Sequence, residues 1–249
     1  MKTFSLLLIG LMLTTISMAQ GTIPLIGNRA PSFEANTTNG KLVFPEDFGE
    51  SWKVLFSHPG DFTPVCTSEI LELARMQDEF EKLNVKLAII STDDLKTHHQ
   101  WKQSMEDILQ KENNNDSISF PFIDDSKARI SNKYGMLHAW DNKTRDVRGV
   151  FVVGPDNVIK SVNFYPNNIG RNVVELKRLL VALQTSEQYN VFTPVNWAVG
   201  DDVLLPYQPT LNSDTTLNTE FKDNYYKVGI NLWYKRGSSE LIPASTTNE

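Results

Sequence analysis

Residues 85–91 read VKLAIIS, a short β-branched run without a helical period, and this stretch decides the fold. Such a run is typical of a strand that is buried on both faces of a sheet. Before it, apolar residues recur every three or four positions, which predicts a helix with one apolar face: Ile70, Leu73, Met76, Phe80 and Leu83. After it, Asp93 or Asp94 is placed to cap a further helix over residues 95–109. The segment therefore predicts a strand between two helices.

The alternation of strands and helices continues on both sides of this segment. Residues 52–57 (WKVLFS) form a second apolar run, which stops at the break His58-Pro59-Gly60. Residues 149–153 and 158–165 flank the turn sequence GPDN, which is the pattern of a hairpin. A final helix with leucines on one face is expected to start near Arg171. Strands in alternation with helices, plus one hairpin, predict a mixed sheet covered by helices, which is a three-layer α/β domain.

Composition and charge exclude several classes of protein. The chain has 249 residues, with 24 Lys or Arg, 30 Asp or Glu and a formal net charge of -6, and 40% of its residues are hydrophobic. These values are typical of a soluble globular chain with one large domain or two small ones. Because no basic block is present, we expect no nucleic-acid partner. A single cysteine, Cys66, excludes an internal disulfide.

The first nineteen residues have the pattern of an export signal. Lys2 precedes an apolar run over residues 4–16, and small residues end the stretch at Ser17-Met18-Ala19. The run is shorter than the ~20 apolar residues that cross a bilayer, so we expect no stable membrane anchor. A core helix is the other alternative. The pattern predicts cleavage near Ala19 and an exported protein, either periplasmic or secreted.

The sequence divides into three parts. Residues 1–19 are the predicted signal, residues 20–185 the predicted α/β domain, and residues 186–249 a C-terminal arm rich in Pro, Asn and aromatic residues. Within the arm, residues 227–234 (KVGINLWY) alternate well enough to predict a strand. An arm with so few apolar runs needs a surface to pack on. That surface belongs either to a second subunit or to the main domain as an extension of its core.

The chemistry concentrates in residues 58–67, which read HPGDFTPVCT. Thr63 suits the cap of a helix and Pro64 its first position, so Cys66 falls within the first turn. Free backbone N–H groups and the helix dipole stabilise an anion there, which favours a thiolate. The Thr63 hydroxyl is placed to hydrogen-bond the sulfur and an incoming oxygen. The alternative is that Cys66 is a small buried hydrophobic residue.

This segment, PGDFTPVCT after a strand that ends in FSH, resembles the active-site motif of the peroxiredoxins, the AhpC/TSA family. The resemblance covers residues 26–206 and includes further segments of the chain: FPFIDD at 120–125, RGVFVVGPD at 148–156, YP at 165–166, GRN at 170–172 and TPVNW at 193–197. The last two, with the lone cysteine, are similar to the one-cysteine class that carries a long C-terminal arm.

The resemblance implies a thioredoxin-like fold and a thiol peroxidase that needs no metal and no cofactor. Cys66 would attack hydrogen peroxide or an organic hydroperoxide and become a sulfenic acid. Arg148 would hold the thiolate and polarise the peroxide, Thr63 would bond to the peroxide oxygens, and Pro59 would shield the pocket. His58 matches a family position beside the site, although a histidine with an ordinary structural role at a strand end is an equally good interpretation.

The resemblance also implies partners. Without a resolving cysteine, the sulfenic acid requires an external thiol or another reductant. A homodimer or a higher homo-oligomer is expected, with a role in antioxidant defence. One alternative function is a holdase chaperone or structural oligomer in which Cys66 is incidental. A thiol-disulfide oxidoreductase is excluded, because position 63 of the expected Cys-x-x-Cys motif is Thr.

Other motifs give weaker signals. Some members of this class show phospholipase activity attributed to a Gly-x-Ser-x-Gly-like sequence. Here Ser51 and Asp156 match, but Lys53 replaces the second glycine and Pro45 the histidine, so we expect no lipase activity. His98 and the adjacent His99 point in different directions on a helix and are not expected to bind a metal together. Asp124-Asp125 and Asp201-Asp202 are expected to be turn or capping carboxylates.

Overall fold

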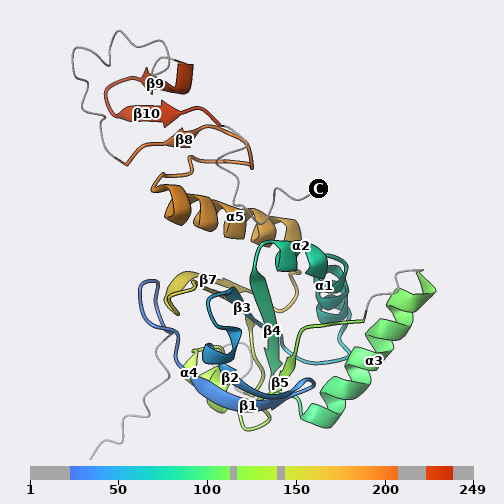
Figure 1. The fold of residues 1–249 in the computed structure, drawn as a ribbon. Coiled ribbons are helices and arrows are strands. Elements are labelled where there is room, and N and C mark those ends of the chain that lie inside the picture. The colour runs from blue at the N-terminus through green and yellow to red at the C-terminus, as the bar shows by residue number, and fades with distance from the viewer. Residues whose placement is uncertain (1–22, 113–116, 139–143, 207–222, 238–249) are drawn as a thin grey trace, which may run out of the picture.

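The computed structural model describes residues 23–112, 117–138, 144–206 and 223–237. The predicted export signal, residues 1–19, lies outside the described residues. A seven-stranded mixed sheet with the order β2-β1-β5-β4-β3-β6-β7 forms the centre of the molecule (Figure 1). Its strands are β1 (Phe33–Thr37), β2 (Gly40–Phe44), β3 (Trp52–Ser57), β4 (Val85–Ser91), β5 (Phe122–Asp124), β6 (Arg148–Val153) and β7 (Ile159–Tyr165).

The central strands follow from their sequences. The VKLAIIS run forms β4, which pairs in parallel with β3 on one side and with β5 on the other. The predicted hairpin is present as β6 and β7, and β6 pairs antiparallel with β3. All six residues of β3 and of β6 are buried, because helices and loops cover both faces of the sheet at this point.

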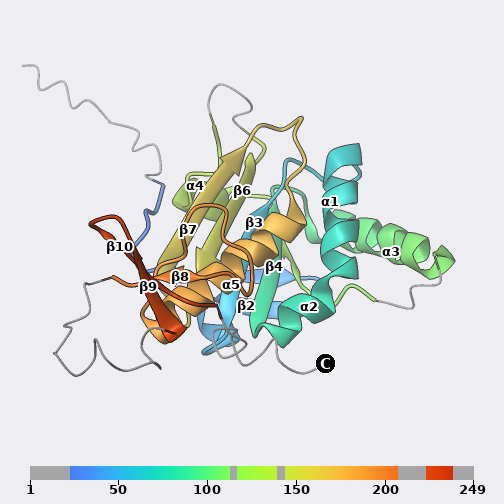
Figure 2. The same cartoon turned by 90° about the horizontal axis from the view of Figure 1, so that it is seen from above.

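Helices cover both faces of the sheet. Alternate strand residues point to opposite sides: Val54 and Phe56 contribute to one apolar core and Leu55 to the other. The first core is closed by four helices, namely α1 (Pro64–Arg75), α2 (Gln77–Lys82), α3 (Leu95–Lys111) and α5 (Val173–Tyr189). The second core is closed by α4 (Arg129–Lys133), beside the short helix η1 (Glu46–Phe48). Figure 2 shows α5 and α2 over the sheet from above. The predicted three-layer, thioredoxin-like architecture is confirmed.

Two elements differ from the sequence-based prediction. The single helix predicted over residues 70–83 is two helices that meet at Met76, and the apolar period continues through the joint because Phe80 and Leu83 remain buried. The strand predicted over residues 227–234 is wrong. The chain turns at Gly229, which has a φ of +63°, so the alternating residues belong to the hairpin of β9 (Tyr225–Val228) and β10 (Leu232–Lys235).

The first described part of the C-terminal arm lies inside the main core, and residues 223–237 lie outside it. Val191, Trp197 and Val203 are buried in the same core as α5, so this part of the arm extends the domain. Strand β8 (Val203–Leu204) then pairs with β10, which forms a small sheet with β9 beyond α5 (Figure 1). Ile230, at the tip of this sheet, is 79% exposed. None of the helices in the described parts of the chain is both long and apolar enough to span a membrane.

Candidate active site

Cys66 lies in the first turn of α1, directly beyond the loop that follows β3. Thr63 is extended, Pro64 is the first helical residue, and Cys66 is the third, as the sequence predicts. The side chain of Thr63 does not cap the helix, however. Its Oγ1 donates instead to the carbonyl oxygen of Gly60 at 2.9 Å. The hydroxyl therefore stabilises the loop, and no hydrogen bond from it to the sulfur is present among the described residues.

Arg148, the first residue of β6, contacts the sulfur of Cys66. Its Nη1 lies 3.2 Å from Cys66 Sγ, and its Nε and Nη2 donate to the carbonyl oxygen of Asn167 at 3.1 and 2.7 Å. The cysteine is 0% exposed, which by itself agrees with an inert core residue. A buried guanidinium aimed at the sulfur argues against that interpretation, because a residue that only fills space needs no charged neighbour.

Glu69 and Arg171 complete a buried charge cluster that sequence analysis did not include in the site. Glu69 Oε2 accepts from Arg148 Nη1 at 2.8 Å and from Arg171 Nη2 at 2.7 Å, while its Oε1 accepts from the Arg171 backbone N–H and Nε. Arg171 Nη1 donates to the carbonyl oxygens of Ser57 and Gly149. Burial lowers the pKa of Arg171, and the hydrogen bond that Arg171 donates to Glu69 opposes that shift.

A signal for Glu69 was present in the sequence. It lies three residues after Cys66 and directly before the apolar Ile70, on the face of α1 that points into the core. A glutamate on such a face needs a buried cation. Arg171 lies within the GRN segment that carried the family resemblance, but its position in the sequence gives no indication that it would meet Glu69.

The charges of this cluster favour an anionic sulfur. Arg148 and Arg171 supply two positive charges, and Glu69 supplies one negative charge, with all three side chains at most 3% exposed. An uncompensated charge in a buried site is costly. A thiolate at Cys66 brings the cluster to neutrality, whereas a thiol leaves one excess positive charge.

His58 and Pro59 lie on the loop between β3 and α1. The Pro59 carbonyl oxygen accepts from Arg145 Nη1 at 3.2 Å. His58 is fully buried against Trp101, with 4.9 Å between the ring centroids, and its Nε2 lies 3.5 Å from Asp61 Oδ1. Burial, followed by the charges of His98 and Arg171, holds the pKa of His58 well below its usual range, so its ring is neutral.

The residues that match the phospholipase pattern are engaged elsewhere. Ser51 Oγ donates to Asn84 Oδ1 at 2.7 Å. Lys53 is buried, and its Nζ donates to Asn157 Oδ1 at 2.7 Å and to the carbonyl oxygens of Gly154 and Pro155 in the β6–β7 turn. Asp156 accepts from Lys160 and from the backbone of Val158. Lys53 therefore acts as an anchor for the hairpin that carries Arg148.

The carboxylate pairs have the structural roles that the sequence predicts. Asp125 accepts from the backbone N–H groups of residues 129–131, and Asp124 accepts from those of Leu95 and Ser126. In the described part of the chain, no group of three His, Cys, Asp or Glu side chains is arranged to hold a metal ion.

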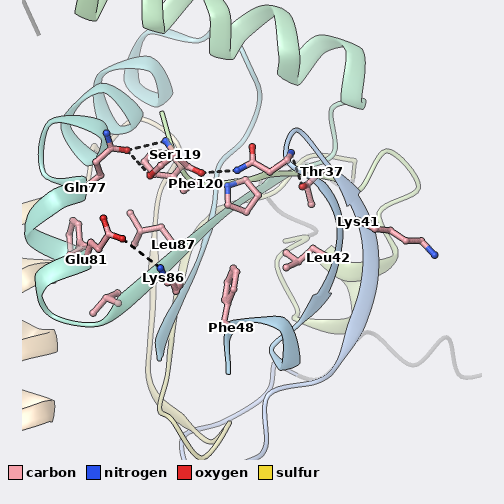
Figure 3. Close-up of a pocket in the computed structure, with 14 residues that line it drawn as sticks. Thr37, Lys41, Leu42, Phe48, Gln77, Glu81, Lys86, Leu87, Ser119 and Phe120 are labelled. Carbon is pink, nitrogen blue, oxygen red and sulfur yellow. Dashed lines mark hydrogen bonds and ion pairs between the residues drawn. The ribbon is translucent and has the colours of Figure 1, made fainter. Parts of the chain in front are cut away.

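A cavity of about 380 Å³ lies away from Cys66, between the β1–β2 hairpin and α2 (Figure 3). Phe48, Leu87 and Phe120 form its apolar walls, and the Gln77–Ser119 and Glu81–Lys86 contacts lie at one side. Its lining contains no residue of the Cys66 cluster, so it is not part of the candidate active site.

Comparisons with known proteins agree with this geometry. The sequence model of the AhpC/TSA family matches residues 26–162, and that of the C-terminal domain of 1-Cys peroxiredoxin matches residues 182–218. A peroxiredoxin of Methanosarcina mazei is 44% identical over 185 residues, which are 74% of this chain and 84% of the relative. The mitochondrial peroxiredoxin PRX1 of Saccharomyces cerevisiae is 40% identical over 76% of this chain and 72% of its own.

Solved structures are similar over most of the chain. The yeast mitochondrial 1-Cys peroxiredoxin has a TM-score of 0.74 and 33% identity, covering 86% of this chain and 100% of that one. A cysteine-to-serine mutant of peroxiredoxin 6 from Arenicola marina has a TM-score of 0.75 and 31% identity, covering 86% and 99%. The chain belongs to the AhpC/TSA family, the peroxiredoxins, and to its one-cysteine class of thiol-dependent peroxidases.

Proposed function

We propose that this protein reduces hydrogen peroxide and organic hydroperoxides through Cys66 as its single peroxidatic residue. The observation that carries the proposal is the 3.2 Å contact between Arg148 Nη1 and Cys66 Sγ inside a buried cluster that a thiolate neutralises. A helix N-terminus and a fixed cation together are the environment in which protein thiols react as nucleophiles.

The reaction balances as a two-electron transfer. The Cys66 thiolate attacks the terminal oxygen of the peroxide, so a sulfur–oxygen bond forms while the oxygen–oxygen bond breaks. The transferred oxygen keeps its hydrogen, giving a sulfenic acid, and the departing alkoxide or hydroxide takes a proton from solvent. Sulfur is oxidised by two electrons and the peroxide is reduced to an alcohol or water.

Each neighbouring residue has a proposed role in this step. Arg148 stabilises the thiolate and the charge that develops on the peroxide oxygens. Thr63 positions the peroxide from the start of α1, and Pro59 shields the sulfur from water. His58, a neutral ring on the same loop, shapes the wall of the pocket without transferring a proton.

An external thiol closes the cycle, because Cys66 is the only cysteine of the chain. One thiol condenses with the sulfenic acid to a mixed disulfide and water, and a second thiol releases Cys66 by disulfide exchange. The solved yeast relative is described as resolved via glutathione and thioredoxin systems, and we extend this class of reductant to the present chain.

The assembly and location are part of the same proposal. Residues 1–19 direct export, residues 20–185 form the catalytic domain, and residues 186–249 form an arm at a subunit interface. Strand β7 supports a homodimer, because it is an edge of the sheet with six of its seven residues only half-buried. The exposed apolar tip of the β9–β10 hairpin is a second surface suited to a partner subunit.

The decisive experiment mixes the purified, pre-reduced protein with hydrogen peroxide and follows thiol loss and Trp fluorescence by stopped flow. A Cys66→Ser variant is the control. Rapid formation of a sulfenic acid that dimedone traps, absent from the control, supports the proposal. A rate no faster than that of a free thiol would contradict it. Prevention of aggregation by both proteins alike, without peroxide turnover, would favour a holdase instead.

A further inference from the structure

Asp61 and His98 form a buried pair at the active-site loop. None of the catalytic roles described above uses this pair. His98 Nδ1 lies 2.7 Å from Asp61 Oδ2, and both side chains are at most 1% exposed. His98 belongs to α3, whereas Asp61 lies on the loop between β3 and α1. The pair therefore connects α3 to the loop from which the Cys66 helix begins.

The second ring nitrogen of His98 determines the protonation of the pair. His98 Nε2 lies 3.0 Å from the carbonyl oxygen of Ile123, which only accepts hydrogen bonds, so Nε2 carries a proton. If Nδ1 carried none and Asp61 were ionised, two lone pairs would face each other at 2.7 Å. One proton therefore lies between the imidazole and the carboxyl group.

The loop held by this pair contains a strained residue. Phe62 has a φ of +57°, a left-handed conformation that costs a non-glycine residue about 1 to 2 kcal/mol. Its side chain is 56% exposed, so packing in the core does not hold it. The conformation persists because its neighbours are fixed: the Asp61 N–H donates to Asp93 Oδ2 at 2.8 Å, and Thr63 Oγ1 donates to Gly60.

We propose that Asp61 and His98 are positioning residues for the peroxidase reaction. Their shared proton holds the strained loop, and with it Thr63 and the first turn of α1, in the geometry in which Cys66 reacts. Loss of that proton leaves a buried carboxylate facing a lone pair, which opens the pair and releases the loop. The inference rests on the proposed function of Cys66.

The direction of the pH dependence follows from the surroundings of His98. Burial alone lowers its pKa, but the hydrogen bond and charge of Asp61 outweigh burial and raise the pKa above its ordinary value of 6.5. The pair therefore keeps its proton at low pH and loses it as the pH rises through the raised pKa, so activity falls on the alkaline side. His58 faces the pair directly, because its Nε2 lies 3.5 Å from Asp61 Oδ1. The charged groups that face the pair, directly or through His58, are Asp93, Asp94, Arg148 and Arg171.

Three variants test the proposal. His98→Gln removes the shared proton. Asp61→Asn replaces the carboxyl group with an amide that donates to a neutral imidazole, which keeps a hydrogen bond but has no proton to lose. His99→Gln is the matched control, because His99 is the adjacent residue on α3 and is exposed. The second-order rate constant of Cys66 with hydrogen peroxide is measured from about pH 6 to about pH 10, which brackets the titration of His and Cys.

We expect His98→Gln to lower the rate constant by between about tenfold and about 100-fold, since small displacements of reacting groups have effects of this size. His99→Gln is expected to stay within about twofold of the unmodified protein. The alkaline fall of the unmodified protein is expected to disappear in Asp61→Asn. A downfield NMR resonance assigned to the proton between His98 Nδ1 and Asp61 Oδ2, present in His99→Gln and absent from the other two variants, gives a readout independent of activity; the Nε2 proton that faces the Ile123 carbonyl oxygen is expected to remain in Asp61→Asn.

Several results would overturn the proposal. A His98→Gln rate and pH profile equal to those of the unmodified protein would show that the pair does not position the site. If that variant does not fold, an alkaline fall that persists in Asp61→Asn contradicts the shared proton. These results differ from a failure of the proposed peroxidase function, in which the unmodified protein itself would not react rapidly with peroxide.

Discussion

Replacement of Arg148 by lysine tests the charge cluster most directly. Arg148 Nη1 donates to Cys66 Sγ at 3.2 Å and to Glu69 Oε2 at 2.8 Å. Its Nε and Nη2 donate to the carbonyl oxygen of Asn167, which fixes the plane of the guanidinium group. A lysine has one nitrogen, which cannot hold the carboxylate and the sulfur in the same geometry. The positive charge is retained, but the oriented donor to the sulfur is lost.

The expected size of the effect follows from this loss of one donor. An oriented donor to a developing charge contributes about 2.7 to 4 kcal/mol, which is about a 100- to 1,000-fold change in rate. The lost contacts to Asn167 are expected to lower the free energy of unfolding by about 1.5 to 3 kcal/mol, the range for hydrogen bonds of charged groups.

Stopped-flow fluorescence with hydrogen peroxide measures the rate, and urea denaturation measures the stability. Arg75→Lys is the matched control, since Arg75 is the last residue of α1 and its side chain is 34% exposed. A folded Arg148→Lys variant whose rate constant falls by less than about tenfold, or 1.4 kcal/mol, would refute the assigned role of the oriented guanidinium.

Three further substitutions have defined outcomes. Thr63→Val is expected to lower the peroxide rate constant by between about tenfold and about 100-fold, and an unchanged rate would exclude Thr63 from the reaction. Glu69→Gln leaves two buried guanidinium groups without a carboxylate and should lower the free energy of unfolding by about 3 to 5 kcal/mol, measured by urea denaturation; a loss below about 1 kcal/mol would contradict the buried network. Asp146→Asn should raise the melting temperature at neutral pH: neither carboxyl oxygen has a hydrogen-bond partner among the described residues, and burial raises its pKa well above 3.8. That gain should shrink as the pH falls toward 3.8, and a lower melting temperature would indicate a partner for the carboxylate.

The parts of the fold that sequence analysis predicted well depend on local patterns. The run of β4 and the cap of α3 are correct, and Asp94 accepts from the Thr97 backbone as an N-cap. The hairpin at Gly229 was missed because the alternation of apolar and polar residues over 227–234 continues across the turn. The first hairpin, β1 and β2, was not predicted, because its two strands are only five residues each and too short for a clear hydrophobic pattern.

Without the family resemblance, the site could be predicted only where its residues share a segment. Cys66, Thr63 and Pro59 follow one another in the sequence, so their proximity needed no fold. Arg148 was assigned from the family resemblance alone. The contacts of Glu69 with Arg171 and of Asp61 with His98 join residues that are distant in sequence, and a single sequence carries no signal for such pairs. For His98, the sequence argues only against a metal site shared with His99, because the buried contact with Asp61 that distinguishes the two histidines depends on the fold.

The same charge balance that favours the reduced thiolate also favours its regeneration. In the proposed cycle, a protonated sulfenic acid carries no charge, so oxidation of Cys66 would leave Arg148 and Arg171 facing Glu69 alone, with one excess positive charge in a buried site. Reduction by an external thiol restores the thiolate and the neutral cluster. Glu69 belongs to α1, Arg148 to β6, and Arg171 lies just before α5, so the ion pairs of the cluster join three parts of the fold. On the proposed mechanism, this buried cluster is therefore expected to contribute to the driving force for reduction of the sulfenic acid, even though the reductant comes from another molecule.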